Sequence, residues 1–283
     1  MRIALDVNFP FETPAGLDIW TEGLIEGFSK INKENQFFIF GYFWRNFDER
    51  KEKLKLPESN YFTLFLKKFP KPIITFLEDN NIPIIERWLL KKNIDIYHST
   101  GYFVPNLKKI KSIVTIHGLD FEEMDSYWYK DKWYKNVPLY LSRANKIIAV
   151  SQYVKNSIVK HYKIPEKKIK VIYPGLKNTF RLIEDKNELN LFREKYNIFF
   201  PYILTVITVA ERKNLKGIFY SFSHIKDFYP ELKLVIVGNT QEVQSPFLST
   251  IEKLGIKEKV FFPGYISSNE LVYFYNLAEL FIF

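Results

Sequence analysis

Two basic side chains, Arg212 and Lys213, stand where an apolar run ends and an amphipathic helix pattern begins. The next residue, Asn214, is of a type that caps helix N-termini, so free backbone N–H groups and the positive end of the helix dipole would point toward the same spot. Such a corner favours phosphate, and it would lie outside the carboxyl end of a parallel strand, where open α/β sheets bind ligands. The alternative is a solvated turn between strand and helix.

Length and composition limit the class of protein. At 283 residues the chain is long enough for two domains that each bury a core. A hydrophobic content of 47% and a mean hydropathy of −0.17 are typical of a soluble globular protein, and no apolar run could span a bilayer. The N-terminus lacks the pattern of a signal peptide, cysteine is absent and only four histidines are present. These features predict a cytoplasmic protein without disulfides and argue against a metal site.

The net charge of +9 indicates an anionic partner, but charge alone does not separate phosphate ligands, nucleic acid and acidic lipid. The stretch from Tyr127 to Lys135 alternates aromatic residues with lysines. We expect an amphipathic helix whose rings lie beneath lysine stems. Contact with an acceptor or an anionic membrane surface is the second interpretation, and stacking on nucleic acid is the third. Because no recognised nucleic-acid module accompanies the stretch, we predict no nucleic-acid partner.

Short apolar runs alternate with helical patterns through the first half of the chain, which is typical of a parallel sheet with helices on both faces. The predicted strands are Arg2 to Val7, Gln36 to Gly41, Tyr61 to Leu66, Ile94 to His98, Ser112 to His117, Lys146 to Val150 and Lys170 to Ile172. A helix is predicted from Gly16 to Ile31, and Ser151 is expected to cap another.

The turn from Tyr173 to Leu176 ends this series, so we predict domains over residues 1–175 and 176–283. The second series has predicted strands at Tyr202 to Val209, Leu232 to Val237, Val260 to Phe262 and Leu280 to Phe283, with helices beginning near Asn214, Glu242 and Ser267. Ser267 and Glu270 predict a capping box. The last strand has no covering helix after it, so we expect a truncated second domain or a sheet that another chain completes.

Several segments together resemble the family 4 retaining glycosyltransferases of the GT-B architecture. They run in family order and are Pro14-Ala15-Gly16, IDIYHSTGYFVP, SIVTIHGLDF, ANKIIAVSQYVKNSIVKHY, KIKVIYPGL, YILTVITVAERKNLKGI, LKLVIVGN and VFFPGYISSNELVYFYNLAELFIF. The resemblance implies an α/β fold of two Rossmann-like domains that face each other across a cleft. The first would be the acceptor-side domain and the second the donor-nucleotide domain. The sequence ends before the Glu-x7-Glu pair by which the family holds the donor.

The resemblance also implies the donor site. Arg212 and Lys213 match the basic pair that the family uses on the donor diphosphate, with Asn214 at the helix start beside them. Gly16 matches the glycine loop that approaches the donor phosphate and the acceptor, and its lack of a Cβ beside a helix N-terminus suits that role; an ordinary turn glycine is the alternative. Gly238 matches a glycine that faces the nucleotide.

Two histidines match family positions on the acceptor side. His117 ends the run SIVTIH and precedes Gly118, where the family has a histidine beside the reacting sugar. It could hydrogen-bond a sugar hydroxyl or assist the acceptor, and the alternative is a strand-end histidine whose partner is the backbone. His98, in IYHSTGYF, occupies a second family position at a neighbouring strand end and is expected to face the sugar or the acceptor.

The sequence departs from the family near the basic pair. Ile207 stands where the family usually has glycine, and Ala210-Glu211 stands where it has an acidic residue and proline. The Ile207 side chain would either crowd the phosphate or pack in the core. Asn239 replaces a second glycine after Gly238.

The resemblance implies front-face transfer, in which the leaving diphosphate of a nucleotide-diphosphate sugar accepts the proton of a glycan or lipid-linked acceptor. No protein nucleophile, metal or other cofactor is then expected. The catalytic residues would be His117, Arg212 and Lys213, which stabilise growing charge in a dry cleft. Two other hypotheses remain: a nucleotide-sugar epimerase of the same architecture, and a truncated chain that binds nucleotide without turnover.

Overall fold

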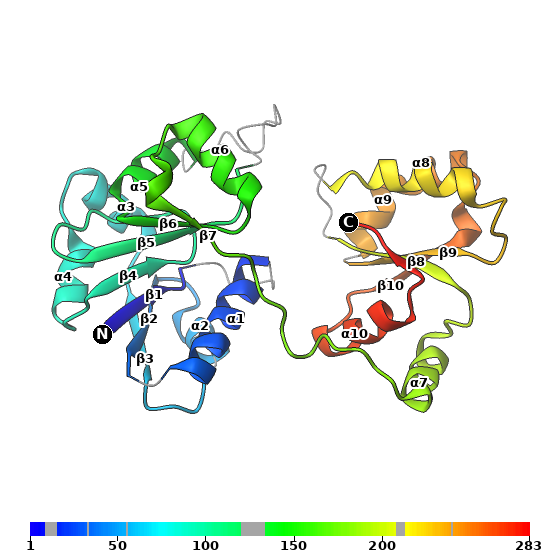
Figure 1. The fold of residues 1–283 in the computed structure, drawn as a ribbon, viewed down its shortest axis with the longest axis horizontal. Coiled ribbons are helices and arrows are strands. Elements are labelled where there is room, and N and C mark those ends of the chain that lie inside the picture. Colours follow the sequence, from blue (N-terminus) through cyan, green and yellow to red (C-terminus); the bar gives the residue numbers. More distant parts are fainter. Residues whose placement is uncertain (9–15, 33, 55, 120–133, 208–212, 239) are drawn as a thin grey trace. The chain divides into compact units, whose positions relative to one another are not determined.

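The computed structural model describes residues 1–283 except 9–15, 33, 55, 120–133, 208–212 and 239 (Figure 1). The chain forms two compact units, an N-terminal unit from Met1 to Leu176 and a C-terminal unit from Lys177 to Phe283. This division falls one residue after the boundary expected from the turn at Tyr173 to Leu176. Each unit is described by itself.

The N-terminal unit is built on a seven-stranded parallel sheet with the strand order β3-β2-β1-β4-β5-β6-β7 (Figure 1). Its strands are β1 (Arg2–Asp6), β2 (Gln36–Phe43), β3 (Phe62–Lys68), β4 (Ile96–Ser99), β5 (Lys111–Ile116), β6 (Lys146–Ala149) and β7 (Ile169–Val171). The described helices are α1 (Gly16–Ile31), α2 (Phe47–Lys53), α3 (Lys71–Asp79), α4 (Ile84–Leu90), η3 (Tyr134–Asn136), α5 (Val137–Arg143), α6 (Gln152–Tyr162) and η4 (Glu166–Lys168).

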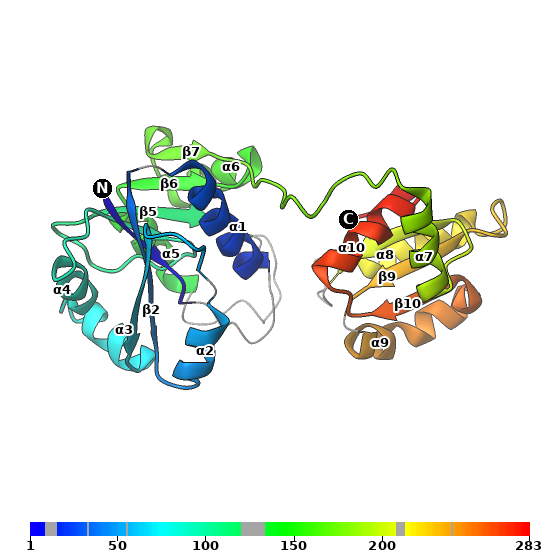
Figure 2. The ribbon, with the colours of Figure 1, turned by 90° about the horizontal axis from the view of Figure 1, so that it is seen from below.

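Both faces of this sheet are buried, which explains why its strands read as nearly continuous apolar runs. Leu5 and Ile39 pack with Ile25 of α1 on one face. Their neighbours in sequence, Ala4 and Phe40, belong to a second core that includes residues of α3 and α4. Figure 2 shows α3 and α4 next to each other, in agreement with their direct contact.

The strand order reverses between β1 and β4, and this topological switch point fixes where a ligand site can form. At the carboxyl end of β1, Asp6 lies opposite Ser99 of β4. Ser99 in turn lies opposite Val114 of β5, so the loops that follow all three strands begin at the same edge of the sheet. The expected position of His117, directly after β5, is therefore beside the switch point.

The C-terminal unit contains a four-stranded parallel sheet with the order β10-β9-β8-β11. Its strands are β8 (Tyr202–Val206), β9 (Lys233–Val237), β10 (Val260–Gly264) and β11 (Leu280–Phe281), and its described helices are α7 (Lys186–Tyr196), α8 (Leu215–Ile225), α9 (Thr240–Lys253), η6 (Lys257–Lys259) and α10 (Ser268–Leu277). Figure 1 shows α8 and α9 on one side of this sheet and α7 and α10 on the other, each pair with its own apolar core. The order reverses between β8 and β11, which places the switch point beside β8.

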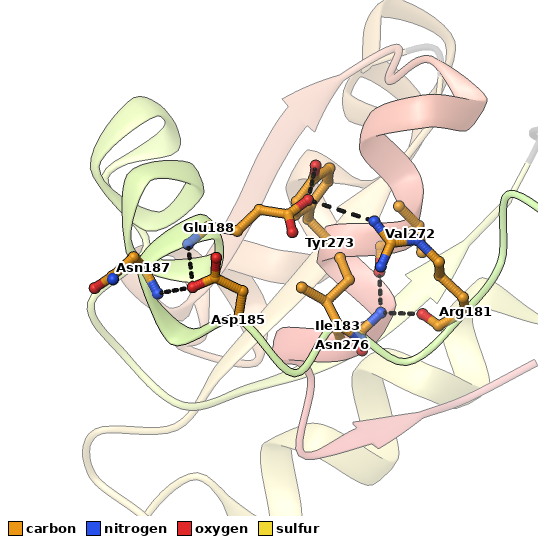
Figure 3. Close-up of polar contacts among 8 residues, drawn as sticks. All are labelled: Arg181, Ile183, Asp185, Asn187, Glu188, Val272, Tyr273 and Asn276. Carbon is orange, nitrogen blue, oxygen red and sulfur yellow. Dashed lines mark hydrogen bonds and ion pairs between the residues drawn. The ribbon is translucent and has the colours of Figure 1, made fainter.

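The side-chain amide of Asn276, on α10, binds the segment that precedes α7 (Figure 3). The Nδ2 atom of Asn276 donates to the backbone oxygens of Arg181, at 2.9 Å, and of Val272, at 2.8 Å. The Oδ1 atom of Asn276 accepts from the backbone N–H of Ile183 at 2.8 Å. The segment that enters this unit is therefore held along α10 before α7 begins.

Two predictions about helix ends had different outcomes. Ser151 caps α6 as expected, because its Oγ accepts from the backbone N–H of Val154 at 3.1 Å. Ser267 is the N-cap of α10, so the predicted helix start is confirmed, but the predicted capping-box bond is wrong: the Ser267 side chain caps no backbone N–H, and its Oγ donates to Glu270 Oε2 at 2.8 Å. The Glu270 carboxylate attracts this hydroxyl while also accepting from Lys195 Nζ at 2.6 Å, which is the main reason that the pKa of Glu270 falls to about 2.

Candidate functional site

His117 lies directly beyond β5 and is half-buried. Its Nε2 is 3.0 Å from the backbone oxygen of Thr100, and since a carbonyl only accepts, Nε2 carries the hydrogen. Burial lowers the pKa of His117, which favours the neutral ring. A neutral imidazole held in this way presents Nδ1 as a hydrogen-bond acceptor. The His117 ring is thus compatible with both interpretations of the sequence. One nitrogen has a backbone partner, and the other can accept a hydrogen bond from a sugar or an acceptor.

His98 is more deeply placed, with 6% of its surface exposed. Its Nε2 lies 2.9 Å from Thr115 Oγ1 of the neighbouring strand. Burial, with a smaller electrostatic contribution from the neighbouring His117, lowers the pKa of His98 to about 4, so the ring is neutral at pH 7. Trp20 of α1 meets both imidazoles edge-on, with ring centroids 4.7 Å from His117 and 6.5 Å from His98. The structure thus brings the two predicted histidines together against one indole.

Asp6, at the end of β1, was not singled out as a site residue from the sequence. It is 3% exposed, and its Oδ1 accepts from the backbone N–H of Asn8 at 2.8 Å and from Asn8 Nδ2 at 2.6 Å. Its Oδ2 accepts from the hydroxyl of Tyr97 on β4. Burial raises the pKa of Asp6 to about 6, although these hydrogen bonds oppose the shift. An acidic residue near the end of an otherwise apolar first strand is the signal that could have found it.

Gly16 is the first residue of α1, and a Cβ built there would have no described atom within 4 Å. No packing contact among the described residues therefore requires glycine at this position. Residues 9–15, which precede it, lie outside the described part of the chain. The phosphate-approach role of Gly16 stays a prediction.

The predicted phosphate corner of the C-terminal unit is described from Lys213 onward, whereas Arg212 and Glu211 lie outside the described residues. Asn214 is the N-cap of α8, as expected, and its side chain accepts from the backbone N–H of Gly217 at 3.2 Å. The ammonium of Lys213 lies 3.5 Å from the ring centroid of Phe283, which follows β11. Lys213 is therefore positioned beside the β8–β11 switch point, at the start of a capped helix.

Gly238 directly follows β9, which pairs with β8. A Cβ at this residue would overlap the backbone oxygen of Ile207, so the ends of the two strands approach closely only because residue 238 is glycine. Ile207 itself is 5% exposed and packs in the core beneath α8 and α9. Of the two outcomes considered for the departure at Ile207, core packing is the observed one. Asn239 lies outside the described residues.

Two features are absent from the described residues. These residues contain no group of three or more His, Cys, Asp or Glu side chains placed to hold a metal ion. No helix among them is long and apolar enough to cross a membrane. The stretch from Tyr127 to Lys135 lies outside the described residues up to position 133, and its last two residues begin η3.

Two models of known protein families match most of the chain. A model described as Glycosyltransferase Family 4 matches residues 36–178, and one described as Glycosyl transferases group 1 matches residues 190–283.

Three curated relatives illustrate the sequence likeness. The serotype-specific mannosyltransferase WbdA of Escherichia coli is 24% identical over 159 residues, which are 54% of this chain and 19% of that protein. The O-antigen chain mannosyltransferase RfbU of Salmonella typhimurium is 26% identical over 186 residues, which are 65% of this chain and 48% of that protein. The uncharacterized glycosyltransferase MJ1059 of Methanocaldococcus jannaschii is 25% identical over 272 residues, covering 87% and 62%. The chain thus spans about a fifth of WbdA and half of RfbU.

Solved structures share the fold. Sucrose-phosphate synthase from Thermosynechococcus elongatus aligns with a TM-score of 0.70 and 15% identity over 99% of this chain and 74% of its own. Anabaena HepE, solved with UDP and glucose, aligns with a TM-score of 0.68 and 13% identity over 99% of this chain and 73% of its own. The UDP-GlcNAc 2-epimerase of Methanocaldococcus jannaschii aligns with a TM-score of 0.57 and 19% identity over 99% of this chain and 78% of its own. The predicted α/β class, with two parallel sheets of the GT-B type, is confirmed. Because the first family model covers half of the chain and the second most of the remainder, the chain belongs to glycosyltransferase family 4.

Proposed function

We propose that this protein transfers a sugar from a nucleotide-diphosphate sugar to a glycan or lipid-linked acceptor, with retention of the anomeric configuration. The observation that carries the proposal is the position of Lys213 in a chain of this family. Its ammonium lies at the start of α8, whose N-terminus is capped by Asn214, beside the switch point of the C-terminal sheet. A cation and free helix N–H groups at such a place suit a diphosphate.

Negative charge grows on the β-phosphate as the glycosidic bond breaks. In our proposal Arg212 and Lys213 stabilise that charge, and the N–H groups at the start of α8 contribute fixed dipoles. Removing one preorganised donor of this kind typically lowers kcat by about 10²–10³-fold. The leaving phosphate oxygen takes the proton of the acceptor hydroxyl, so no protein nucleophile and no metal take part. Gly16 and Gly238 leave room for the phosphates and the nucleotide.

The N-terminal unit supplies contacts to the sugar or the acceptor. His117 presents Nδ1 to a sugar hydroxyl, while its Nε2–H is held by Thr100. His98 supports this edge from a buried position, where Thr115 Oγ1 is its partner. Both rings act as neutral hydrogen-bonding groups at pH 7, because burial lowers both pKa values.

Mannose is the first sugar to test, because WbdA and RfbU are named as mannosyltransferases. UDP-glucose is the second, because it is the ligand named with a HepE structure. We further propose that the protein works in the cytoplasm, in peripheral contact with an anionic membrane when the acceptor is lipid-linked. The net charge of +9 supports that last step.

The decisive experiment replaces both cations, Arg212→Ala and Lys213→Ala, and measures binding of nucleoside diphosphates and nucleotide sugars by calorimetry. We expect at least a tenfold loss of affinity with an unchanged circular dichroism spectrum. Lys253→Ala, at an exposed position in the last turn of α9, is the matched control. Unchanged affinity in the folded double variant would overturn the assignment of the donor site.

Turnover assays separate the proposed function from its rivals. A transferase consumes donor faster with acceptor extract, keeps its rate in EDTA, and gives a product whose anomeric configuration NMR identifies as retained. A new nucleotide sugar formed without acceptor would instead indicate an epimerase, a reading that the fold likeness to UDP-GlcNAc 2-epimerase keeps open. Nucleotide binding without turnover under any condition would indicate a binding chain.

A further inference from the structure

The side chain of Asp6 connects the two strands that flank the switch point of the N-terminal unit. Oδ2 accepts from the hydroxyl of Tyr97, which is on β4, so the carboxylate bridges β1 and β4. Oδ1 accepts twice from Asn8, through the backbone N–H and Nδ2. The Oδ1 atom of Asn8 in turn accepts from the backbone N–H of Tyr42 on β2, at 2.6 Å. The buried carboxylate of Asp6 thus links the end of β1 to β4 directly and to β2 through Asn8.

The backbone of Asp6 continues this network toward His117. The hydroxyl of Thr100 donates to the backbone oxygen of Asp6 at 2.6 Å. The backbone oxygen of the same Thr100 accepts from His117 Nε2 at 3.0 Å. Thr100 is fully buried, so water does not compete for these contacts. The hydrogen-bonded path from Asp6 to the imidazole therefore has a single residue between its ends.

We propose that Asp6 is a positioning residue for His117. By holding the ends of β1 and β4 together, it sets the place of Thr100, which keeps the hydrogen of His117 on Nε2 and leaves Nδ1 to accept from substrate. Through Asn8 it also ties the end of β1 to Tyr42 of β2. The catalytic meaning of this arrangement rests on the proposed function, whereas the arrangement itself does not.

The charge of Asp6 matters because an ionised carboxylate accepts all three hydrogen bonds, whereas a protonated one carries a donor of its own. The described groups that face it are Tyr97 from β4, Tyr42 from β2 and Lys71 from α3. Burial raises the pKa values of both tyrosines well above their usual range, so they stay protonated. Lys71 lowers the pKa of Asp6, but burial outweighs it and leaves that pKa at about 6. Asp6 therefore changes its charge near pH 6 while its tyrosine neighbours do not.

The test is the nitrogen spectrum of the imidazoles, with the four histidines assigned by single His→Gln substitutions. In the wild type we expect His117 to show the Nε2–H tautomer, and its signals to show, besides the titration of the ring itself, a separate inflection near pH 6 as Asp6 titrates. Asp6→Asn should remove that inflection and shift the His117 signals, while those of His161 and His224 stay in place. Tyr97→Phe, which keeps the carboxylate but removes one of its donors, should also shift His117 and carries the test if Asp6→Asn does not fold.

Tyr42→Phe is the matched control, because it removes a buried hydroxyl from the neighbouring strand and leaves the backbone N–H of residue 42 bonded to Asn8. It should leave the His117 signals unchanged. Coincident His117 spectra of wild type and the folded Asp6 or Tyr97 variant would refute the proposal.

Activity is read separately. We expect Asp6→Asn to lower kcat for sugar transfer about tenfold with a smaller effect on the KM of the donor. If the wild type shows the expected spectra but no transfer, the proposed function fails and the positioning role stands. If transfer occurs and the His117 spectrum does not depend on Asp6, the positioning role fails alone.

Discussion

At Gly238 there is no room for a side chain, because a Cβ built there would overlap the backbone oxygen of Ile207. Gly238→Ala must push the ends of β8 and β9 apart, so we expect a loss of about 1–3 kcal/mol in the free energy of unfolding, the usual cost of overpacking. Urea denaturation followed by circular dichroism measures it. Gly27→Ala is the control: it lies inside α1 with no described atom within 4 Å of a built Cβ, and alanine there should stabilise by up to about 1 kcal/mol. Equal effects of the two substitutions would contradict this explanation.

Asp6 makes stability depend on pH in the direction opposite to that of a salt-bridged acid. Its pKa is raised from 3.8 in the unfolded chain to about 6 in the folded protein, so the folded state binds the extra proton between these values. The free energy of unfolding should therefore fall as pH rises from about 4 to about 6, by about 3 kcal/mol from this group. Asp6→Asn should lack this component in denaturation curves recorded across the range. Parallel pH profiles of wild type and variant would exclude the shift.

At the scale of elements, the loop that leads into β5 depends on two buried acids rather than on packing alone. Glu86 of α4 accepts from the backbone N–H groups of Lys108 and Lys109, both at 2.6 Å. Glu78 of α3 accepts from the N–H of Asn106 at 2.7 Å, and burial raises its pKa. These carboxylates hold the start of the strand whose far end leads to His117.

Glu86→Ala would leave these N–H groups without their acceptor, so we expect it to lower the free energy of unfolding by about 2–4 kcal/mol. Hydrogen exchange should quicken at the amides of residues 108–110. Glu52→Ala, at an exposed position of α2, serves as the control and should change neither quantity. Unaltered exchange at residues 108–110 in Glu86→Ala would show that other contacts hold the loop.

Local sequence signals predicted the elements well where the signal and its cause lie close together. The helix from Gly16 to Ile31 has the predicted bounds, and Ser151 caps α6 through a residue three positions away. Ser267 was predicted from the same kind of local pattern and differs, because Lys195 and its neighbours build a carboxylate site around Glu270. Residue 195 is 75 positions away, so no local pattern could contain this competition.

The candidate site divides in the same way. The positions of His98 and His117 at neighbouring strand ends could be predicted from the ends of apolar runs, since β4 and β5 are neighbours in the sheet; their roles stay predictions. Asp6 could not be assigned, because its partner Tyr97 is 91 positions later and reaches it only when β4 pairs with β1. The reason for glycine at position 238 is likewise a tertiary contact, because a side chain there would overlap the backbone oxygen of Ile207.

At the scale of the whole molecule, the excess of 41 basic over 32 acidic residues predicts adsorption to anionic lipid. On α3, Ile73 and Phe76 are 46% and 65% exposed, next to the exposed Lys71. We expect co-sedimentation with vesicles that contain phosphatidylglycerol, weakened by salt because exposed charges are screened. Phe76→Ser should reduce binding, whereas Phe228→Ser, an equally apolar exposed position in the C-terminal unit, should not. Equal binding to neutral vesicles would speak against charge as the cause.

Because Trp20 contacts His117 edge-on, the fluorescence of Trp20 should report the protonation state of His117. A protonated imidazole quenches the fluorescence of an adjoining indole, whereas a neutral one does so far less. Emission from Trp20 should consequently dim as the solution is acidified, and it should respond when a hydroxyl-bearing molecule engages the ring. Subtracting the spectrum of Trp20→Phe removes the emission of the other four tryptophans, so ligand binding at His117 could be followed without an attached dye.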